Sequence, residues 1–165
     1  MFSGRFGNTA GRPYLEALVF LPRLNITGGV SFLVDTGADR TVLMPTDSMR
    51  MGLNYRCLRP AHLLSGIGGE CKSFQEPALI IFSDESKAQL VVYDIQISIA
   101  EKKAAHLRCA SLLGRDVLHR LRMSYNFRQK KIVFTVSSAD ARVSLEKANA
   151  ETLKGKIKEL KPLPQ

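Results

Sequence analysis

An acidic residue directly follows an apolar, strand-like segment, and this junction constrains the fold more than any other feature of the chain. Residues 32–34 are Phe-Leu-Val, and Asp35 comes next, followed by the small residues Thr-Gly-Ala at 36–38. Gly37 and Ala38 leave space beside the carboxylate for another stretch of backbone or for a substrate. A carboxylate at the end of a buried strand is unfavourable unless it is hydrogen-bonded or paired, so Asp35 is a candidate for chemistry. The element occurs once, so a partner carboxylate would have to come from a second copy of the chain.

The length and composition are those of a single globular domain with a short appendage. The chain has 165 residues, of which 45% are apolar and 24% charged, and a chain of this size buries roughly two-thirds of its unfolded surface. The longest apolar runs, at residues 17–21 and 78–82, are far too short to span a bilayer. Residues 1–12 are polar and glycine-rich and lack the apolar region of a signal peptide. We therefore expect a soluble, cytoplasmic protein with no membrane partner.

The cysteines do not suggest a disulfide framework or a metal site. Cys57, Cys71 and Cys109 are odd in number and widely spaced, which is typical of free thiols, and we expect them to be buried or unreactive. His106 and Cys109 have ligand-like spacing, but no second pair completes a zinc site. We expect neither a metal ion nor a cofactor.

The net charge of the chain is strongly positive. Lys and Arg number 24 against 15 Asp and Glu, which gives +9, and such a charge is compatible with binding to phosphates. The basic residues are scattered, however, and no aromatic residues are interleaved with them in a stacking pattern. This distribution favours a solvated surface over a nucleic-acid partner.

Short apolar segments separated by turns at regular intervals predict a β-dominated domain over residues 13–137. A turn is expected at residues 25–29, residues 62–74 have the pattern of a hairpin with a glycine-rich tip, and Asp116 can cap a short helix through Leu121. The pattern is typical of a closed sandwich or barrel. The expected strands cover residues 14–21, 30–34, 41–44, 77–82, 89–99, 107–113, 124–127 and 132–136.

The two ends of the chain differ from this domain. We expect residues 1–12 to form a flexible arm and residues 138–165 to form a basic tail. Ala, Glu, Lys and Leu dominate the tail, which predicts a C-terminal helix. Its apolar residues lie loosely at helical spacing, at Leu145, Ala148, Leu153 and Ile157.

Two further motifs follow the Asp-Thr-Gly-Ala-Asp sequence at residues 35–39. They are Gly-Ile-Gly-Gly at 66–69 and Leu-Leu-Gly-Arg-Asp at 112–116. In this order the three motifs resemble those of the retropepsin-like, or retroviral-type, aspartic proteases, and the resemblance covers residues 14–136. It implies an all-β fold, the closed β-barrel of the acid proteases, with one short helix after the third motif. A longer spacer after the second motif, Glu-Cys at 70–71 and the basic tail suggest a cellular rather than a viral member.

The resemblance makes Asp35 the catalytic acid of a homodimer. Asp35 of one copy would meet Asp35 of the other across a two-fold axis, and the pair would activate a water molecule that hydrolyses a peptide bond. Two carboxylates at close range cannot both ionise easily, so they share one proton. The chemistry needs no metal and no cofactor.

The residues beside Asp35 are implied to support it. In the family, the hydroxyl of the residue at Thr36 bonds across the dimer, and the glycine at 37 brings its backbone close to the carboxylates. A hydroxyl at residue 38 could donate to the carboxylates and favour their charged form. Ala38 cannot do so, which predicts a mildly acidic rather than strongly acidic pH optimum.

The third motif is implied to brace the active-site turn. Asp39 and Arg115 are expected to form an ion pair, because each stands next to a motif glycine. Gly114 is expected to let its strand pass close to the turn. We interpret Asp116 as a helix cap rather than a catalytic residue.

The glycine-rich hairpin is implied to be a flap over the bound peptide. Gly66, Gly68 and Gly69 would permit a tight tip and hinge motion, with Ile67 as its apolar end. A peptide substrate would bind in an extended form between flap and floor. Cys71 at the base of the flap raises the hypothesis of a redox-sensitive hinge.

These expectations lead to a homodimeric aspartic endopeptidase with one active site per dimer. The alternative from a different class is a dimer of the same fold that acts as a protein- or nucleic-acid-binding scaffold with little or no proteolysis. The intact Asp35-Thr36-Gly37 sequence favours the enzyme, because a scaffold has no need of a paired acid.

Overall fold

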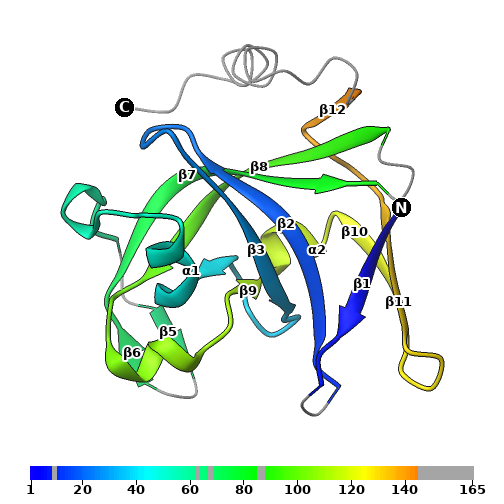
Figure 1. The fold of residues 1–165 in the computed structure, drawn as a ribbon, viewed down its shortest axis with the longest axis horizontal. Coiled ribbons are helices and arrows are strands. Elements are labelled where there is room, and N and C mark those ends of the chain that lie inside the picture. Colours follow the sequence, from blue (N-terminus) through cyan, green and yellow to red (C-terminus); the bar gives the residue numbers. More distant parts are fainter. Residues whose placement is uncertain (9–10, 62–63, 67–68, 85–87, 145–165) are drawn as a thin grey trace.

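Two antiparallel hairpins contain the four longest strands of the described residues (Figure 1). The computed structural model describes residues 1–8, 11–61, 64–66, 69–84 and 88–144. The strands are β1 (Phe2–Phe6), β2 (Pro13–Leu21), β3 (Ile26–Val34), β4 (Val42–Leu43), β5 (Leu64–Gly66), β6 (Gly69–Cys71), β7 (Ser73–Ser83), β8 (Gln89–Ala100), β9 (Leu112–Leu113), β10 (Leu121–Asn126), β11 (Lys131–Val136) and β12 (Ala141–Ser144). The helices are α1 (Pro45–Arg50) and α2 (Arg115–Leu118), with 3-10 turns at Tyr55–Cys57 and Ala104–Arg108.

Six strands close into a barrel, as the sequence predicts for this fold class. Strand β2 pairs with β3, β3 with β9, β9 with β4, β4 with β8, β8 with β7, and β7 again with β2. The pairing of β3 with β9 is parallel, and β9 lies between β3 and β4. Strand β9 therefore enters the barrel directly beside the point where β3 ends, which is where Asp35 lies.

The inside of the barrel is filled by alternate residues of its long strands. On β2, Leu15, Ala17, Val19 and Leu21 are buried, whereas the residues that alternate with them, Glu16, Leu18 and Phe20, are more exposed. This period of two is the pattern by which a strand presents one face to a core. The same alternation on β7 and β8 directs aromatic and β-branched side chains inward, among them Phe82, Tyr93, Ile95, Ile97 and Ile99.

The N-terminal residues form part of the sheet, so the expectation of a flexible arm is wrong for residues 2–6. Strand β1 pairs with β11 over Phe2–Gly4 and with β2 through Arg5 and Phe6. Phe2 is 3% exposed and stacks on Phe82. One buried aromatic ring at the second residue anchors a segment whose composition is polar and glycine-rich.

Other predicted boundaries also differ from the structure. Strand β3 begins at Ile26 instead of residue 30, because it stays paired with β2 through Gly28 and Gly29. The strand expected at residues 107–113 is limited to Leu112–Leu113 and follows a 3-10 turn. Residues 141–144, expected to be helical, form β12 on the edge of β8, and the remainder of the predicted tail helix lies outside the described residues.

The long elements of the fold are strands, and in the described part of the chain no helix has the length and apolar character needed to cross a membrane.

Candidate active site

Asp35 lies in a tight turn directly after strand β3. Its N–H donates to the carbonyl oxygen of Leu113 on β9 at 3.1 Å, which continues the pairing of β3 with β9. The Gly37 N–H donates to Asp35 Oδ1 at 2.9 Å, and a Cβ atom on residue 37 would lie 3.2 Å from the same oxygen. Glycine at this position therefore lets the main chain hold one carboxylate oxygen in place. Thr36 and Gly37 are exposed and Asp35 is half-buried, so the turn faces outward in the single chain.

The predicted ion pair between Asp39 and Arg115 is present. Both side chains are exposed, 80% for Asp39 and 40% for Arg115, so the pair itself adds little stability. Arg115 also holds the turn through hydrogen bonds to its main chain. Its N–H donates to the Ala38 carbonyl at 2.9 Å, and its Nη1 donates to the Thr36 carbonyl at 3.4 Å. Arg115 thus fixes both sides of Gly37.

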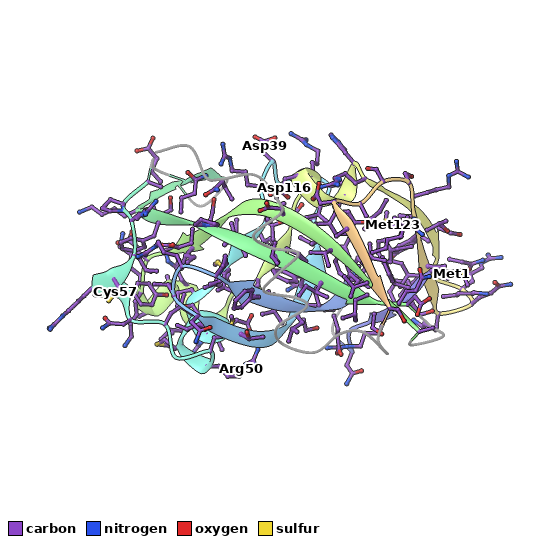
Figure 2. The ribbon with its side chains drawn as sticks, turned by 90° about the horizontal axis from the view of Figure 1, so that it is seen from above. Met1, Asp39, Arg50, Cys57, Asp116 and Met123 are labelled. Carbon is purple, nitrogen blue, oxygen red and sulfur yellow. The ribbon has the colours of Figure 1, made fainter. Side chains whose placement is uncertain are left out.

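A buried hydrogen-bond network beneath the turn joins Thr41 to Asp116. Thr41 is fully buried, and its Oγ1 and N–H donate to the two oxygens of Asp116 at 2.7 and 2.9 Å. The Gly114 N–H donates to Thr41 Oγ1 at 3.2 Å, and the Asp116 N–H donates to the carbonyl of Asp39 at 3.3 Å. Figure 2 shows Asp39 and Asp116 together at one edge of the molecule. The network ties the Asp35 turn to the start of α2.

The interpretation of Asp116 as the helix cap is wrong. The N-cap of α2 is Gly114, which has no side chain to cap with, and the helix ends at Leu118 instead of Leu121. Asp116 stands inside the first turn of the helix, and its carboxylate reaches across to Thr41. Thr41 is not among the site residues predicted from the sequence. A buried threonine on one segment and an aspartate 75 residues later carry no local signal of their contact.

Gly114 passes directly against the main chain of the segment that follows Asp39. A Cβ atom at residue 114 would overlap the carbonyl carbon and oxygen of Arg40 and lie 2.7 Å from the Thr41 nitrogen. The backbone of Gly114 has φ −90° and ψ 179°, an ordinary extended conformation. The requirement for glycine is therefore one of space, and the predicted close approach is confirmed.

The predicted hairpin is present as strands β5 and β6, which pair with Gly66 opposite Gly69. Ile67 and Gly68, the expected tip, lie outside the described residues. In Figure 1 this hairpin and the loop between β3 and β4 lie on the same lower side of the barrel.

Cys71, at the end of the hairpin, is poorly suited to the redox role raised from the sequence. Burial and then the negative charge of Glu101 raise the pKa of its thiol. The reactive thiolate is correspondingly scarce at neutral pH. Cys57 and Cys109 are free and exposed, so of the expectation that the thiols are buried or unreactive, burial is wrong for these two. Among the described residues no group of three or more His, Cys, Asp and Glu could hold a metal ion.

A buried ion pair anchors the chain on both sides of the hairpin. Glu76 on β7 is fully buried, and Arg23 in the turn between β2 and β3 donates to its two oxygens at 2.7 and 2.5 Å. The Arg59 N–H donates to Glu76 Oε1 at 3.1 Å, and Arg23 Nη2 donates to the Cys57 carbonyl at 2.5 Å. The hydrogen bonds with Glu76 raise the pKa of Arg23, so the guanidinium stays charged. The cluster holds the segment that leads into the hairpin against the strand that leaves it.

Replacing Arg23 by methionine is expected to lower the free energy of unfolding by about 3 kcal/mol, because it leaves the Glu76 carboxylate buried without its cation. Urea denaturation of the variant and the parent chain measures the difference. The matched control is Arg5→Met, whose partner Glu16 has a side chain 71% exposed, and whose loss we expect to lower stability by about 1 kcal/mol or less. Equal losses in the two variants would contradict the anchoring role of Arg23.

A family model described as "Aspartyl protease" matches residues 23–117, a span that contains the Asp35 turn, the hairpin and Gly114. No curated protein sequence matches the chain.

Solved structures of proteases and protease-like domains match the chain. A retropepsin-like aspartic protease from Rickettsia conorii is 17% identical with a TM-score of 0.51, covering 86% of this chain and 92% of that one. EIAV protease complexed with the inhibitor HBY-793 is 23% identical with a TM-score of 0.48, covering 68% of this chain and 90% of that one. The retroviral protease-like domain of Ddi1 from Leishmania major is 16% identical with a TM-score of 0.40, covering 78% and 98%.

The family model spans more than half of the chain, and the six-stranded barrel agrees with the fold of the Rickettsia protein. The chain therefore belongs to the aspartyl protease family and has the retropepsin-like fold.

Proposed function

We propose that the protein is a homodimeric aspartic endopeptidase whose active site is formed by Asp35 from each of two copies. The observation that carries the proposal is the position of the single Asp-Thr-Gly turn. It faces outward in one chain, it leads into Asp39, which lies at an edge of the molecule (Figure 2), and Arg115 donates a hydrogen bond to its main chain at Thr36. A turn that is rigid yet open on its outer side is suited to meet its own copy across a two-fold axis.

The two carboxylates would act as one acid–base pair with a shared proton. The ionised carboxylate accepts a proton from a bound water molecule, and the oxygen of that water attacks the carbonyl carbon of the peptide bond. The protonated carboxyl donates a hydrogen bond to the carbonyl oxygen and stabilises the tetrahedral intermediate. A proton then passes to the leaving nitrogen, the carbon–nitrogen bond breaks, and the pair returns to its singly protonated state.

The substrate would be a peptide in an extended conformation. The hairpin of β5 and β6 supplies main-chain groups for pairing with such a segment, and Gly66 and Gly69 face each other at the base of its tip. Extended peptides bind in this way through backbone hydrogen bonds, while alternate side chains enter pockets that set specificity. Two hairpins, one from each copy, would cover the peptide.

Strand β10 provides an edge on which a second copy can pair. Among the described strands it pairs only with β11, and it ends the sheet on that side. Met123 and Tyr125 project from the same face of the strand and are 39% and 49% exposed. An exposed strand edge with apolar side chains is a template for pairing with another chain. This edge lies directly after α2, the helix that braces the Asp35 turn.

We expect the specific activity of the parent chain to fall on dilution, as the dimer dissociates. The Met123→Glu variant should lose activity on dilution at higher protein concentrations than the parent chain does. The charge at residue 123 would stand against its own copy, so we expect the dissociation constant of the dimer to rise about tenfold or more. Peptide-library cleavage between about pH 4 and 7, with sedimentation at matched concentrations, measures both quantities. Thr135→Glu adds the same charge to an exposed position on β11, one strand away from the edge, and serves as control.

A rate strictly proportional to enzyme concentration across the dissociation range would contradict a shared active site. A folded dimer that cleaves no peptide, yet binds nucleic acid or a protein in a salt-dependent manner, would favour the scaffold alternative.

A further inference from the structure

The hairpin of β10 and β11 concentrates positive charge. Residues 121–136 contain Arg122, Arg128, Lys130 and Lys131 and no Asp or Glu. All four are exposed, and none of them forms an ion pair with a residue that the structure describes, whereas six basic residues elsewhere do. Positive charge that has no partner within the chain favours a partner of negative charge outside it.

The cations lie on both faces of the hairpin. Arg122 and Asn126 share one face of β10, and Lys131 is the cross-strand partner of Asn126, so Arg122 and Lys131 lie on the same side. Lys130 follows the turn, and its Nζ lies 3.5 Å from the centre of the Phe127 ring. Among the described strands, β10 ends the sheet here. A polyanion that follows this edge can therefore contact cations of both faces.

Exposed aromatic rings lie beside these cations. Tyr125 is 49% exposed and Phe127 is 44% exposed. The ring of Phe6 meets both of them edge to face, with centroids 5.1 and 5.3 Å away, and such contacts hold the rings in defined orientations. The hairpin therefore combines basic and aromatic side chains, which the scatter of basic residues along the whole chain does not predict. This is the combination with which proteins bind single-stranded nucleic acid, the rings stacking on bases and the cations meeting phosphates.

We propose that the β10–β11 hairpin binds single-stranded nucleic acid, with a base stacked on Tyr125 and phosphates at Arg122, Arg128 and Lys131. An acidic polypeptide would match the charge of the hairpin but gives the exposed rings no planar partner, whereas every nucleic-acid base has one.

The proposal is independent of the proposed peptidase function. Asp35 takes no part in the binding, so Asp35→Asn should bind an oligonucleotide as the parent chain does. Pairing of a second copy on the edge of β10 would use main-chain groups in the plane of the sheet and would leave the faces of the hairpin open to a nucleic acid.

The test measures binding of a fluorescent oligothymidine of about 16 nucleotides to the full chain by anisotropy, between about 50 and 200 mM salt. Arg128→Gln with Lys131→Gln should weaken binding about tenfold or more and lower the slope of log K against log salt by about 1.4, since each phosphate contact on a single strand contributes about 0.7.

The matched control is Arg56→Gln with Arg59→Gln. It removes the same charge from two exposed positions on either side of Cys57, which lies at the opposite end of the molecule from Met123 of β10 (Figure 2). We expect it to leave the affinity and the salt slope unchanged. Tyr125→Ser should weaken binding about tenfold, whereas Tyr125→Phe, which keeps the ring, should bind like the parent chain.

Four outcomes would overturn the proposal. The parent chain could fail to bind the oligonucleotide at the lowest salt concentration. Equal losses in the two double variants would show that binding follows the total charge of the chain and not the hairpin. A duplex of the same length that binds as tightly as the single strand would remove the role of the exposed ring. Polyglutamate that competes as well as the oligonucleotide would assign the hairpin to an acidic polypeptide instead.

Discussion

Replacing Asp35 by asparagine is expected to abolish peptide cleavage, with kcat reduced by at least about 10³-fold, because the substitution removes both members of the proposed acid–base pair at once. The Asp35→Asn variant should keep the fold of the parent chain. Asparagine keeps an oxygen that can accept the hydrogen bond from the Gly37 N–H, which in the parent chain goes to Asp35 Oδ1 at 2.9 Å. Thermal unfolding of the variant should therefore match that of the parent chain, and cleavage assays on a common peptide library measure the loss.

Mixed dimers separate a shared site from a site within one chain. When the parent chain and Asp35→Asn are mixed in equal amounts and allowed to exchange subunits, about one quarter of the dimers carry two aspartates. If both carboxylates are needed, the activity of the mixture is about one quarter of that of the parent enzyme at the same total concentration of chains. If each chain held a complete site, half would remain. Glu16→Gln, an exposed carboxylate on the outside of β2, serves as the control that should leave the activity of the mixture unchanged.

The barrel could be predicted from the sequence because its long strands carry their burial pattern locally. Leu15, Val19 and Leu21 alternate with more exposed residues on β2, and a period of two is visible in the sequence without knowledge of any partner strand. The positions of the three motifs along the chain could be predicted for a similar reason. Each combines a glycine with its chemistry-bearing residue in one short segment, so their local geometry follows from the sequence itself.

The parts of the fold and of the site that could not be predicted depend on contacts between segments far apart in the sequence. The sequence of strand β1 is too polar and glycine-rich to predict a strand. The strand is held in place by Phe2, which stacks on Phe82. Strand β12 was expected as helix because the composition after residue 138 favours helix, whereas pairing with β8 decides the conformation of residues 141–144. The link between Thr41 and Asp116 likewise joins segments far apart in the chain. Tertiary pairing overrode local preference at each of these places.

The second large effect is expected at Gly114. Replacing it by alanine should lower the free energy of unfolding by about 3 kcal/mol or more and reduce activity beyond that loss, because the new methyl group would overlap the main chain of Arg40. Neither main chain can withdraw easily. Leu113, just before Gly114, accepts a hydrogen bond from the Asp35 N–H, and Thr41, just after Arg40, donates to both oxygens of Asp116. A shift of either segment therefore displaces the Asp35 turn, so we expect lower kcat even under conditions in which the variant is fully folded.

Gly29→Ala is the matched control for this substitution. Gly29 also has negative-φ strand backbone in β3, but a Cβ atom there would meet no other atom within 4 Å. We expect its stability to stay within about 1 kcal/mol of the parent chain, with a small gain favoured because alanine restricts the unfolded chain. Urea denaturation and peptide cleavage of the two variants distinguish a need for space from a general intolerance of alanine. A Gly114→Ala variant as stable and active as Gly29→Ala would mean that the β9 strand can move away from Arg40 without disturbing Asp35, and the turn would then not be held as rigidly as the buried network implies.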